Sequence, residues 1–226
     1  MEIYQHLPKI RITNDGSTTL YIEEYDEPYH SINGAIQESM HVFINEGLSK
    51  LSQQHIRIFE VGFGTGLNAF LSCKFSAENN KTIAYTGIEI SPIPIHLISQ
   101  LNFTHNIHNE QLIQAFNAIH QSEWETEQAI TNNFTIKKNK GSINSYSFES
   151  TPFDIIYYDA FAPDKQPEMW NISIFEKLYM MLNQGGLLVT YCAKGSVRRA
   201  LRDVGFNVSR LPGPPGKREM LRAEKV

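Results

Sequence analysis

Short apolar stretches alternate along the chain with longer segments of helical periodicity. Residues 56–61 are apolar at four of six positions, which predicts a strand buried on both faces. Similar strands are predicted at 82–88, 153–158 and 187–192, and helices at about 34–48, 67–76, 91–101, 111–119, 165–181 and from 195 onwards. Strands that alternate with helices favour an α/β fold with a doubly wound, mostly parallel sheet. Residues 219–223 are expected to close this sheet as an antiparallel edge strand.

Two further segments have the pattern of β-hairpins. Residues 9–13 and 18–22 are strand-like and flank an Asp-Gly pair, which is a strong turn signal. This hairpin and the helix at 34–48 predict an N-terminal extension over residues 1–50, followed by the main domain over 51–226. A second hairpin is predicted from 134–138 and 143–148, with three lysines near its turn: Lys137, Lys138 and Lys140.

The chain between the strand at 56–61 and the next helix has glycines at alternate positions. Glycine adopts positive φ and lets a ligand approach the backbone, and the free amides at a helix start favour polar or anionic ligand atoms. We therefore expect a nucleotide-type cofactor here, held by residues of the loop and its borders: Glu60, Gly62, Phe63, Gly64, Thr65, Gly66 and Asn68. The G-x-G-x-G spacing differs from the dinucleotide-binding G-x-G-x-x-G and resembles the first motif of class I S-adenosylmethionine-dependent methyltransferases. The alternative is a tight turn without a ligand.

Glu89 follows the second predicted strand of the sheet, some 20 residues beyond the glycine loop. An acidic residue at this place is positioned to bind the two hydroxyls of a ribose, because a carboxylate accepts hydrogen bonds from both. Glu89 therefore strengthens the prediction of a nucleotide cofactor. The alternative is a surface carboxylate at the end of a strand.

Asp159 follows the strand at 153–158, with Phe161 and Pro163 close behind it. In an open α/β sheet, ligands bind at the carboxyl ends of the strands. An aspartate at this edge can bind an amine, and an aromatic ring two residues later can stack on a flat base. The alternative is an aspartate that caps the next helix.

Length and composition are those of one globular domain with a small extension. The chain has 226 residues, of which 41% are hydrophobic and 19% are charged. Its first residues lack the pattern of a signal peptide, and its apolar runs are too short to span a membrane. Two cysteines without metal-ligand spacing favour free thiols, no bound zinc and a cytoplasmic location.

Charge is distributed unevenly over the sequence. The net charge is −4, but residues 194–226 contain nine basic and three acidic side chains, a net charge of +6 against −10 for the rest. This asymmetry favours a basic face that contacts nucleic acid. A solvated C-terminal surface is the alternative. The candidate contacts are Lys194, Arg198, Arg199, Lys217 and Arg218.

Several segments together resemble one known family. It is the methyltransferase component of the tRNA 5-methylaminomethyl-2-thiouridine biosynthesis protein. The resemblance covers most of the chain and is carried by residues 60–68, 159–163, 167–170, 193–199 and 216–220. Residues 29–38 and 41–43 are similar to the N-terminal region of the family. The family often carries an oxidase half that uses FAD. This sequence has no second glycine-rich nucleotide motif, so a stand-alone methyltransferase without that half is expected.

The resemblance implies a Rossmann-like class I methyltransferase that uses S-adenosyl-L-methionine. It also implies a substrate, the exocyclic amine of 5-aminomethyl(-2-thio)uridine at the wobble position of tRNA. Asp159 is then expected to bind the amine and accept its proton, Phe161 to stack on the base, and Pro163 to stiffen the loop. Two alternatives stay open: a methyltransferase acting on a small-molecule amine, and a non-catalytic module that binds S-adenosylmethionine.

Overall fold

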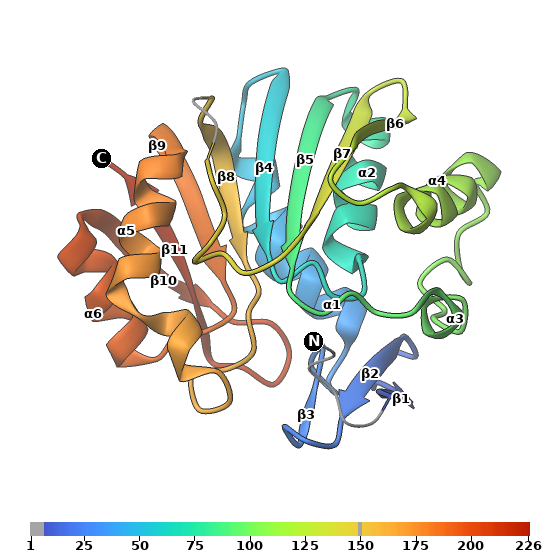
Figure 1. Cartoon of the computed structure of the whole chain (residues 1–226), viewed down its shortest axis with the longest axis horizontal. Helices are drawn as coiled ribbons and strands as arrows, with labels where there is room; N and C mark the ends of the chain where they lie inside the picture. The colour runs from blue at the N-terminus through green and yellow to red at the C-terminus, as the bar shows by residue number, and fades with distance from the viewer. Residues whose placement is uncertain (1–6, 149–150) are drawn as a thin grey trace.

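The computed structural model describes residues 7–148 and 151–226. Residues 1–6, on which the expectation of no signal peptide rests in part, lie outside the described residues. Among the described residues, eight strands form one large sheet in the order β6-β7-β5-β4-β8-β9-β11-β10 (Figure 1). Its strands are β4 (His55–Val61), β5 (Thr82–Glu89), β6 (Glu127–Thr131), β7 (Phe134–Lys140), β8 (Phe153–Tyr158), β9 (Leu182–Thr190), β10 (Phe206–Pro212) and β11 (Glu219–Lys225).

The middle of this sheet is parallel and its edges are antiparallel. β7, β5, β4, β8 and β9 run in the same direction. β6 pairs antiparallel with β7, and β11 pairs antiparallel with both β9 and β10. The predicted doubly wound, mostly parallel sheet with an antiparallel C-terminal strand is therefore confirmed. The prediction that residues 219–223 form the edge of this sheet is wrong, because β11 pairs with β9 on one side and with β10 on the other, and β10 is the edge strand. In this arrangement the carboxyl ends of β4, β5, β7 and β8 meet at one edge, where an α/β sheet binds its ligands.

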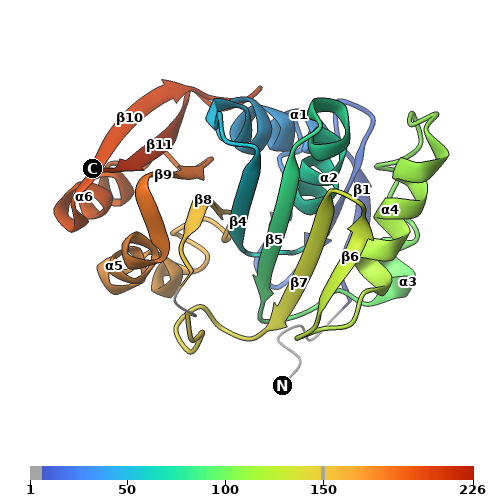
Figure 2. The same cartoon turned by 90° about the horizontal axis from the view of Figure 1, so that it is seen from above.

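Helices cover both faces of the sheet (Figure 2). α2 (Leu67–Asn79) and α4 (Glu110–Gln121) lie on one face, and α5 (Ile172–Met181) and α6 (Gly195–Val204) on the other. Shorter elements are α3 (Ile95–Ile98), η2 (Leu48–Lys50) and η3 (Pro167–Trp170). Each face has its own buried apolar cluster, because strands covered on both sides expose apolar residues to both. Within the described residues, none of the helices has both the length and the apolar character that crossing a membrane requires.

The predicted N-terminal hairpin is confirmed and belongs to a separate small sheet, at the bottom of Figure 1. This sheet contains β1 (Lys9–Ile12), β2 (Thr18–Ile22) and β3 (Glu27–Pro28). α1 (Ala35–Ser39) follows and continues as the π-helical turn η1 (Met40–Asn45). Asp15, in the turn between β1 and β2, accepts a hydrogen bond of 3.0 Å from the amide of Gln37. The small sheet is thereby attached to the start of α1.

The hairpin predicted over 134–148 is wrong. β7 is an interior strand that pairs with β5 on one side and with β6, which precedes it in the chain, on the other. The segment at 143–148 is not a strand, and Ile143 is buried in the core. Of the three lysines near the predicted turn, Lys138 has a buried side chain. Alternation within one strand cannot distinguish an edge strand from an interior strand, because the partners come from distant parts of the chain.

The helix predicted at 91–101 is much shorter than expected. α3 covers only Ile95–Ile98. Pro94 has no amide hydrogen and disfavours helical geometry in the residue before it, so the helix begins after it. Residues 90–94, between the end of β5 and α3, are therefore not helical, and the chain bends at residues 90 and 91.

Candidate active site

The glycine loop makes a close backbone contact between two strand ends. Gly62, Gly64 and Gly66 have φ of 88°, 50° and 69°, in the left-handed region that favours glycine. A Cβ atom on Gly62 would lie 2.5 Å from the carbonyl oxygen of Asp159. The amide of Asp159 in turn donates a 2.9 Å hydrogen bond to the carbonyl of Val61. Gly62 therefore lets the chain that leaves β4 pass directly against the chain that leaves β8.

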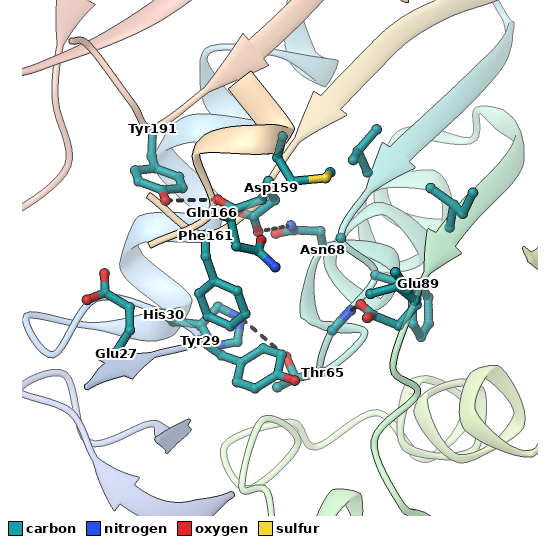
Figure 3. A pocket seen from close by; sticks show the side chains of 18 of the residues that line it. Glu27, Tyr29, His30, Thr65, Asn68, Glu89, Asp159, Phe161, Gln166 and Tyr191 are labelled. Carbon is teal, nitrogen blue, oxygen red and sulfur yellow. Dashed lines mark hydrogen bonds between the residues drawn. The ribbon is translucent and has the colours of Figure 1, made fainter. Parts of the chain in front are cut away.

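A cavity of about 550 Å³ lies over this contact. Its walls come from the ends of β4, β5, β7 and β8 and from the small N-terminal sheet. Of the residues predicted from the sequence, it is lined by Gly62, Phe63, Gly64, Thr65, Asn68, Glu89, Asp159, Phe161 and Lys217. Figure 3 shows Asp159 beside Asn68 in the middle, with Glu89 on one side and Tyr191 on the other. The volume is that of a typical site for a cofactor or small molecule.

Glu89 lies at the wall of the cavity, with only 8% of its surface exposed. One carboxylate oxygen accepts a 3.0 Å hydrogen bond from the amide of Gly64, and the other accepts one of 2.9 Å from Ser91. Burial raises the pKa of Glu89, and these amides oppose the shift. Each carboxylate oxygen has two lone pairs, so both can accept a further hydrogen bond from a ligand hydroxyl. This geometry suits the diol of a ribose.

Asn68, in the first turn of α2, holds two carboxylates together. Its side-chain amide donates to Asp159 at 2.9 Å and to Glu60 at 2.8 Å. Glu60 is completely buried beneath the loop, and burial raises its pKa. Glu60 does not line the cavity, so its contact with the cavity is indirect, through Asn68. Burial, followed by the negative charge of Glu38, raises the pKa of Asp159 to about 7.

A pair of residues that the sequence analysis did not place here completes the wall next to Asp159. Glu38 of α1 forms an ion pair with Lys217, which comes from the loop between β10 and β11. The Lys217 ammonium also lies 3.8 Å from the centre of the Tyr191 ring, and the Tyr191 hydroxyl donates to the carbonyl of Ala160 at 2.9 Å. Glu38 lies within a predicted helix, and nothing in that local pattern indicates that it faces a site.

Aromatic rings form the outer wall of the cavity. Phe161 contacts Tyr29 edge-on at 5.2 Å and Tyr25 at 5.6 Å between ring centres. Next to them, His30 lies within hydrogen-bonding distance of Thr65, at 3.2 Å. Burial lowers the pKa of His30 to about 4, so this ring is neutral at physiological pH. Figure 3 shows Phe161 and Tyr29 facing one another beside the His30–Thr65 pair.

The remaining predicted residues lie outside the cavity lining. Gly66 is the residue immediately before α2. Pro163 occupies the second position of a turn in which the amide of Lys165 donates to the carbonyl of Ala162. Lys194 is exposed and forms an ion pair with Asp164. On α6, Arg198 is half-buried and Arg199 is exposed; Arg218 is exposed next to Lys217. Gly141, Ser142 and Ile143 also line the cavity. They were assigned to the turn and second strand of the predicted hairpin, although their place after a parallel strand is a signal that could have identified them.

Known proteins resemble this chain in sequence and in structure. A family described as "S-adenosyl-L-methionine-dependent methyltransferase" matches residues 102–226. The crystal structure of MNMC2 from Aquifex aeolicus superposes with a TM-score of 0.78 at 27% identity, over 98% of this chain and 71% of that one. Spermidine synthase from Thermotoga maritima shares the fold alone, with a TM-score of 0.54 at 10% identity over 98% of this chain and 80% of that one.

Curated relatives carry the name "tRNA 5-methylaminomethyl-2-thiouridine biosynthesis bifunctional protein MnmC". The protein from Marinomonas sp. (strain MWYL1) is 29% identical over 96% of this chain and 34% of its own length. The protein from Cupriavidus necator is 30% identical over 88% of this chain and 32% of its own length. The chain thus spans about a third of the length of these relatives.

Sheet topology, the glycine loop and Glu89 define a Rossmann-like class I methyltransferase. The chain belongs to the S-adenosyl-L-methionine-dependent methyltransferase family, and the resemblance to the MnmC methyltransferase domain is confirmed. The site fits that cofactor, because the glycines give it close access to the backbone and Glu89 has free acceptor capacity on the cavity wall.

Proposed function

We propose that this protein transfers a methyl group from S-adenosyl-L-methionine to the exocyclic amine of 5-aminomethyl(-2-thio)uridine at the wobble position of tRNA. The names of the curated relatives support this choice of substrate. The observation that carries the proposal is the position of Asp159, whose carboxylate lines the cavity directly beside the glycine loop. This places an acid–base group within the same cavity as the proposed cofactor site.

A primary amine must lose a proton before it can attack, because an ammonium ion has no lone pair. Asp159 is proposed to bind the ammonium and to accept that proton. Its pKa, raised to about 7, lets it be ionised near neutral pH and still hold a proton. Glu27 and Glu38 also line the cavity. Lys217 balances the charge of Glu38, and the carboxylate of Glu27 favours a cationic substrate group over an anionic one.

The proposed cofactor site is the side of the cavity between the glycine loop and Glu89. Glu89 would bind the ribose hydroxyls, while Gly62, Gly64 and the start of α2 leave room for the cofactor against the backbone. When bound, S-adenosyl-L-methionine supplies a methyl group on a positively charged sulfur. The contribution of this chain is then to hold the amine in line with that methyl group, which is the main source of acceleration in such a transfer.

The proposed base site is the aromatic wall. Phe161 lines the cavity and is held by Tyr25 and Tyr29, so its ring is fixed for stacking on a uracil that has left the anticodon stack. Pro163 would stiffen the turn that follows. Arg199 and Arg218 are exposed, and they are proposed to contact tRNA phosphates together with Lys194 and Arg198. With tRNA as the substrate, the proposed compartment is the cytoplasm.

The experiment is mass spectrometry of nucleosides from tRNA incubated with the protein and methyl-labelled S-adenosylmethionine. The tRNA is isolated from cells that cannot perform this methylation, so that its wobble amine is unmodified. The expected product is a wobble nucleoside heavier by one labelled methyl group. Free spermidine is offered in a parallel reaction. Label on spermidine but not on tRNA would favour a small-molecule methyltransferase, and cofactor binding without any labelled product would favour a non-catalytic module.

A further inference from the structure

A second, smaller cavity lies on the other side of the glycine loop. Its volume is about 180 Å³, room for roughly six waters at ~30 Å³ each. Three isoleucines after β5 form one wall (Ile93, Ile95 and Ile98), and Trp124 forms another. Ile95 is 57% exposed, so its side chain stands between the cavity and solvent. One wall of the cavity therefore borders solvent.

Lys138 of β7 lines this second cavity, although it is only 2% exposed. Its ammonium donates one hydrogen bond of 3.0 Å, to the backbone carbonyl of His120. It also lies 5.1 Å from the centre of the Trp124 ring. Among the described residues, no carboxylate forms an ion pair with it, and burial alone lowers its pKa to about 8. The side chain is therefore still mostly cationic at neutral pH, with donor capacity to spare.

His120, at the end of α4, offers a second unused polar atom in the same cavity. Its Nε2 atom is buried and has no hydrogen-bond partner. The ring is held by edge-on contacts with Phe116 at 4.7 Å and Phe63 at 6.2 Å. Burial lowers the pKa of His120 to about 3, so the ring is neutral and can present an N–H at Nε2. A buried polar group without a partner is costly unless a ligand or water satisfies it.

We propose that this cavity binds a small organic carboxylate, whose oxygens accept hydrogen bonds from the Lys138 ammonium and from His120 Nε2. One lysine neutralises one negative charge, which matches a carboxylate better than a phosphate dianion. The isoleucines and Trp124 suit a short alkyl group attached to that carboxylate. The proposal rests on this cavity alone and does not depend on the acceptor of the methyl group.

The second cavity is separate from the proposed cofactor site but shares a wall with it. Phe63 and Gly64 line both cavities. Because the cofactor itself carries a carboxylate, an added carboxylate could also enter the first cavity. The test must therefore fill the first cavity before the probe is added.

The experiment measures thermal unfolding of the protein saturated with S-adenosylhomocysteine, in increasing sodium propionate. Sodium chloride at equal ionic strength and the neutral propionamide are the reference solutes. A ligand at hundred-fold excess over its Kd should raise the Tm of a chain of this size by about 5–10 °C. Propionate is expected to give this rise in Tm, whereas sodium chloride and propionamide are expected to give none.

Lys138→Met keeps the length of the side chain and removes its charge, and it should abolish the rise. Lys140→Met is the matched control, because Lys140 is exposed on the same strand and its variant should respond like the wild type. In wild-type protein, the ring nitrogens of His120 should also shift in ¹⁵N NMR spectra. The proposal is overturned if propionate acts no better than chloride or propionamide, or if Lys138→Met responds as strongly as the wild type.

Discussion

Lys217 and Glu38 lie 179 positions apart in the sequence and form an ion pair at the wall of the cavity that contains Asp159. Glu38 is the more buried partner, with 8% of its side chain exposed against 32% for Lys217. The pair joins the loop before β11 to α1 and acts on Asp159 in two directions. The Glu38 charge raises the pKa of Asp159, and the Lys217 charge lowers it.

The first prediction concerns pH dependence. Asp159 must be ionised to accept a proton, so kcat/KM should rise with pH through its pKa of about 7. Glu38→Gln removes a like charge and leaves Lys217 unpaired. Both changes lower the pKa of Asp159. The rise of kcat/KM with pH, which is the acid limb of the pH profile, should therefore move to lower pH. Glu46→Gln breaks a comparable pair with Arg222 away from the cavity and should leave the limb in place. An unmoved limb in Glu38→Gln would contradict the prediction.

Asp159→Asn tests the catalytic role of the carboxylate directly. The shape and the contact with Asn68 are largely kept, while the acceptor of the proton is lost. Turnover should fall by about 10²–10⁴-fold, the usual contribution of a general base. The Kd for S-adenosylmethionine, measured by calorimetry, should change little. Asp164→Asn, at an exposed position in the same loop, is the control. Normal turnover in Asp159→Asn would exclude the proton-acceptor role.

Glu89→Gln tests the proposed ribose contact. A hydrogen bond to a charged group is worth about 1.5–3 kcal/mol, so the cofactor Kd should rise by about ten- to hundred-fold. Titration calorimetry with S-adenosylhomocysteine measures this change. Glu127→Gln, exposed on the edge strand β6, should bind as the wild type does. If Glu89→Gln kept wild-type affinity, the ribose assignment would have to be abandoned.

Gly62→Ala tests the close approach of β4 to β8. The new Cβ would meet the carbonyl oxygen of Asp159 at 2.5 Å, at a backbone φ of 88°. Gly185→Ala is the matched control, because its φ is 74° and nothing lies within 4 Å of the new atom. The control should be destabilised only because alanine disfavours the left-handed backbone conformation. This costs about 1–2 kcal/mol of stability and lowers the Tm by roughly 2–8 °C. Gly62→Ala should lower the Tm by more than the control does, and this variant should bind the cofactor more weakly. Equal Tm values would show that the close contact is unimportant.

Arg199→Gln tests the proposed contact with tRNA. Each phosphate contact that is lost should lower the slope of log Kd against log salt by about one. Filter-binding titrations at several salt concentrations give this slope. Lys50→Gln removes one positive charge just before β4, at the opposite end of the strands, and should leave the slope unchanged. If both variants gave the wild-type slope, Arg199 would not contact the RNA backbone.

The sequence by itself determined the sheet and the places where its chemistry gathers. Buried strands alternate with helices, and this pattern alone predicts a parallel sheet whose carboxyl ends meet at one edge. Glu89 and Asp159 could be assigned to that edge because each follows a predicted strand, and the glycine loop because its spacing is local. These features depend on residues that are close together in the chain.

Only the tertiary structure decided which distant side chains complete the site. The Glu38–Lys217 pair joins opposite ends of the chain, and no local pattern predicts such a contact. Likewise, a lysine in a strand has the same local sequence whether it is exposed or buried, so only the pairing of β7 with β5 and β6 places Lys138 in the interior of the sheet. Lys138 is buried and lines the second cavity. The effect of burial on its pKa depends on every element packed around it, so the sequence alone does not predict it.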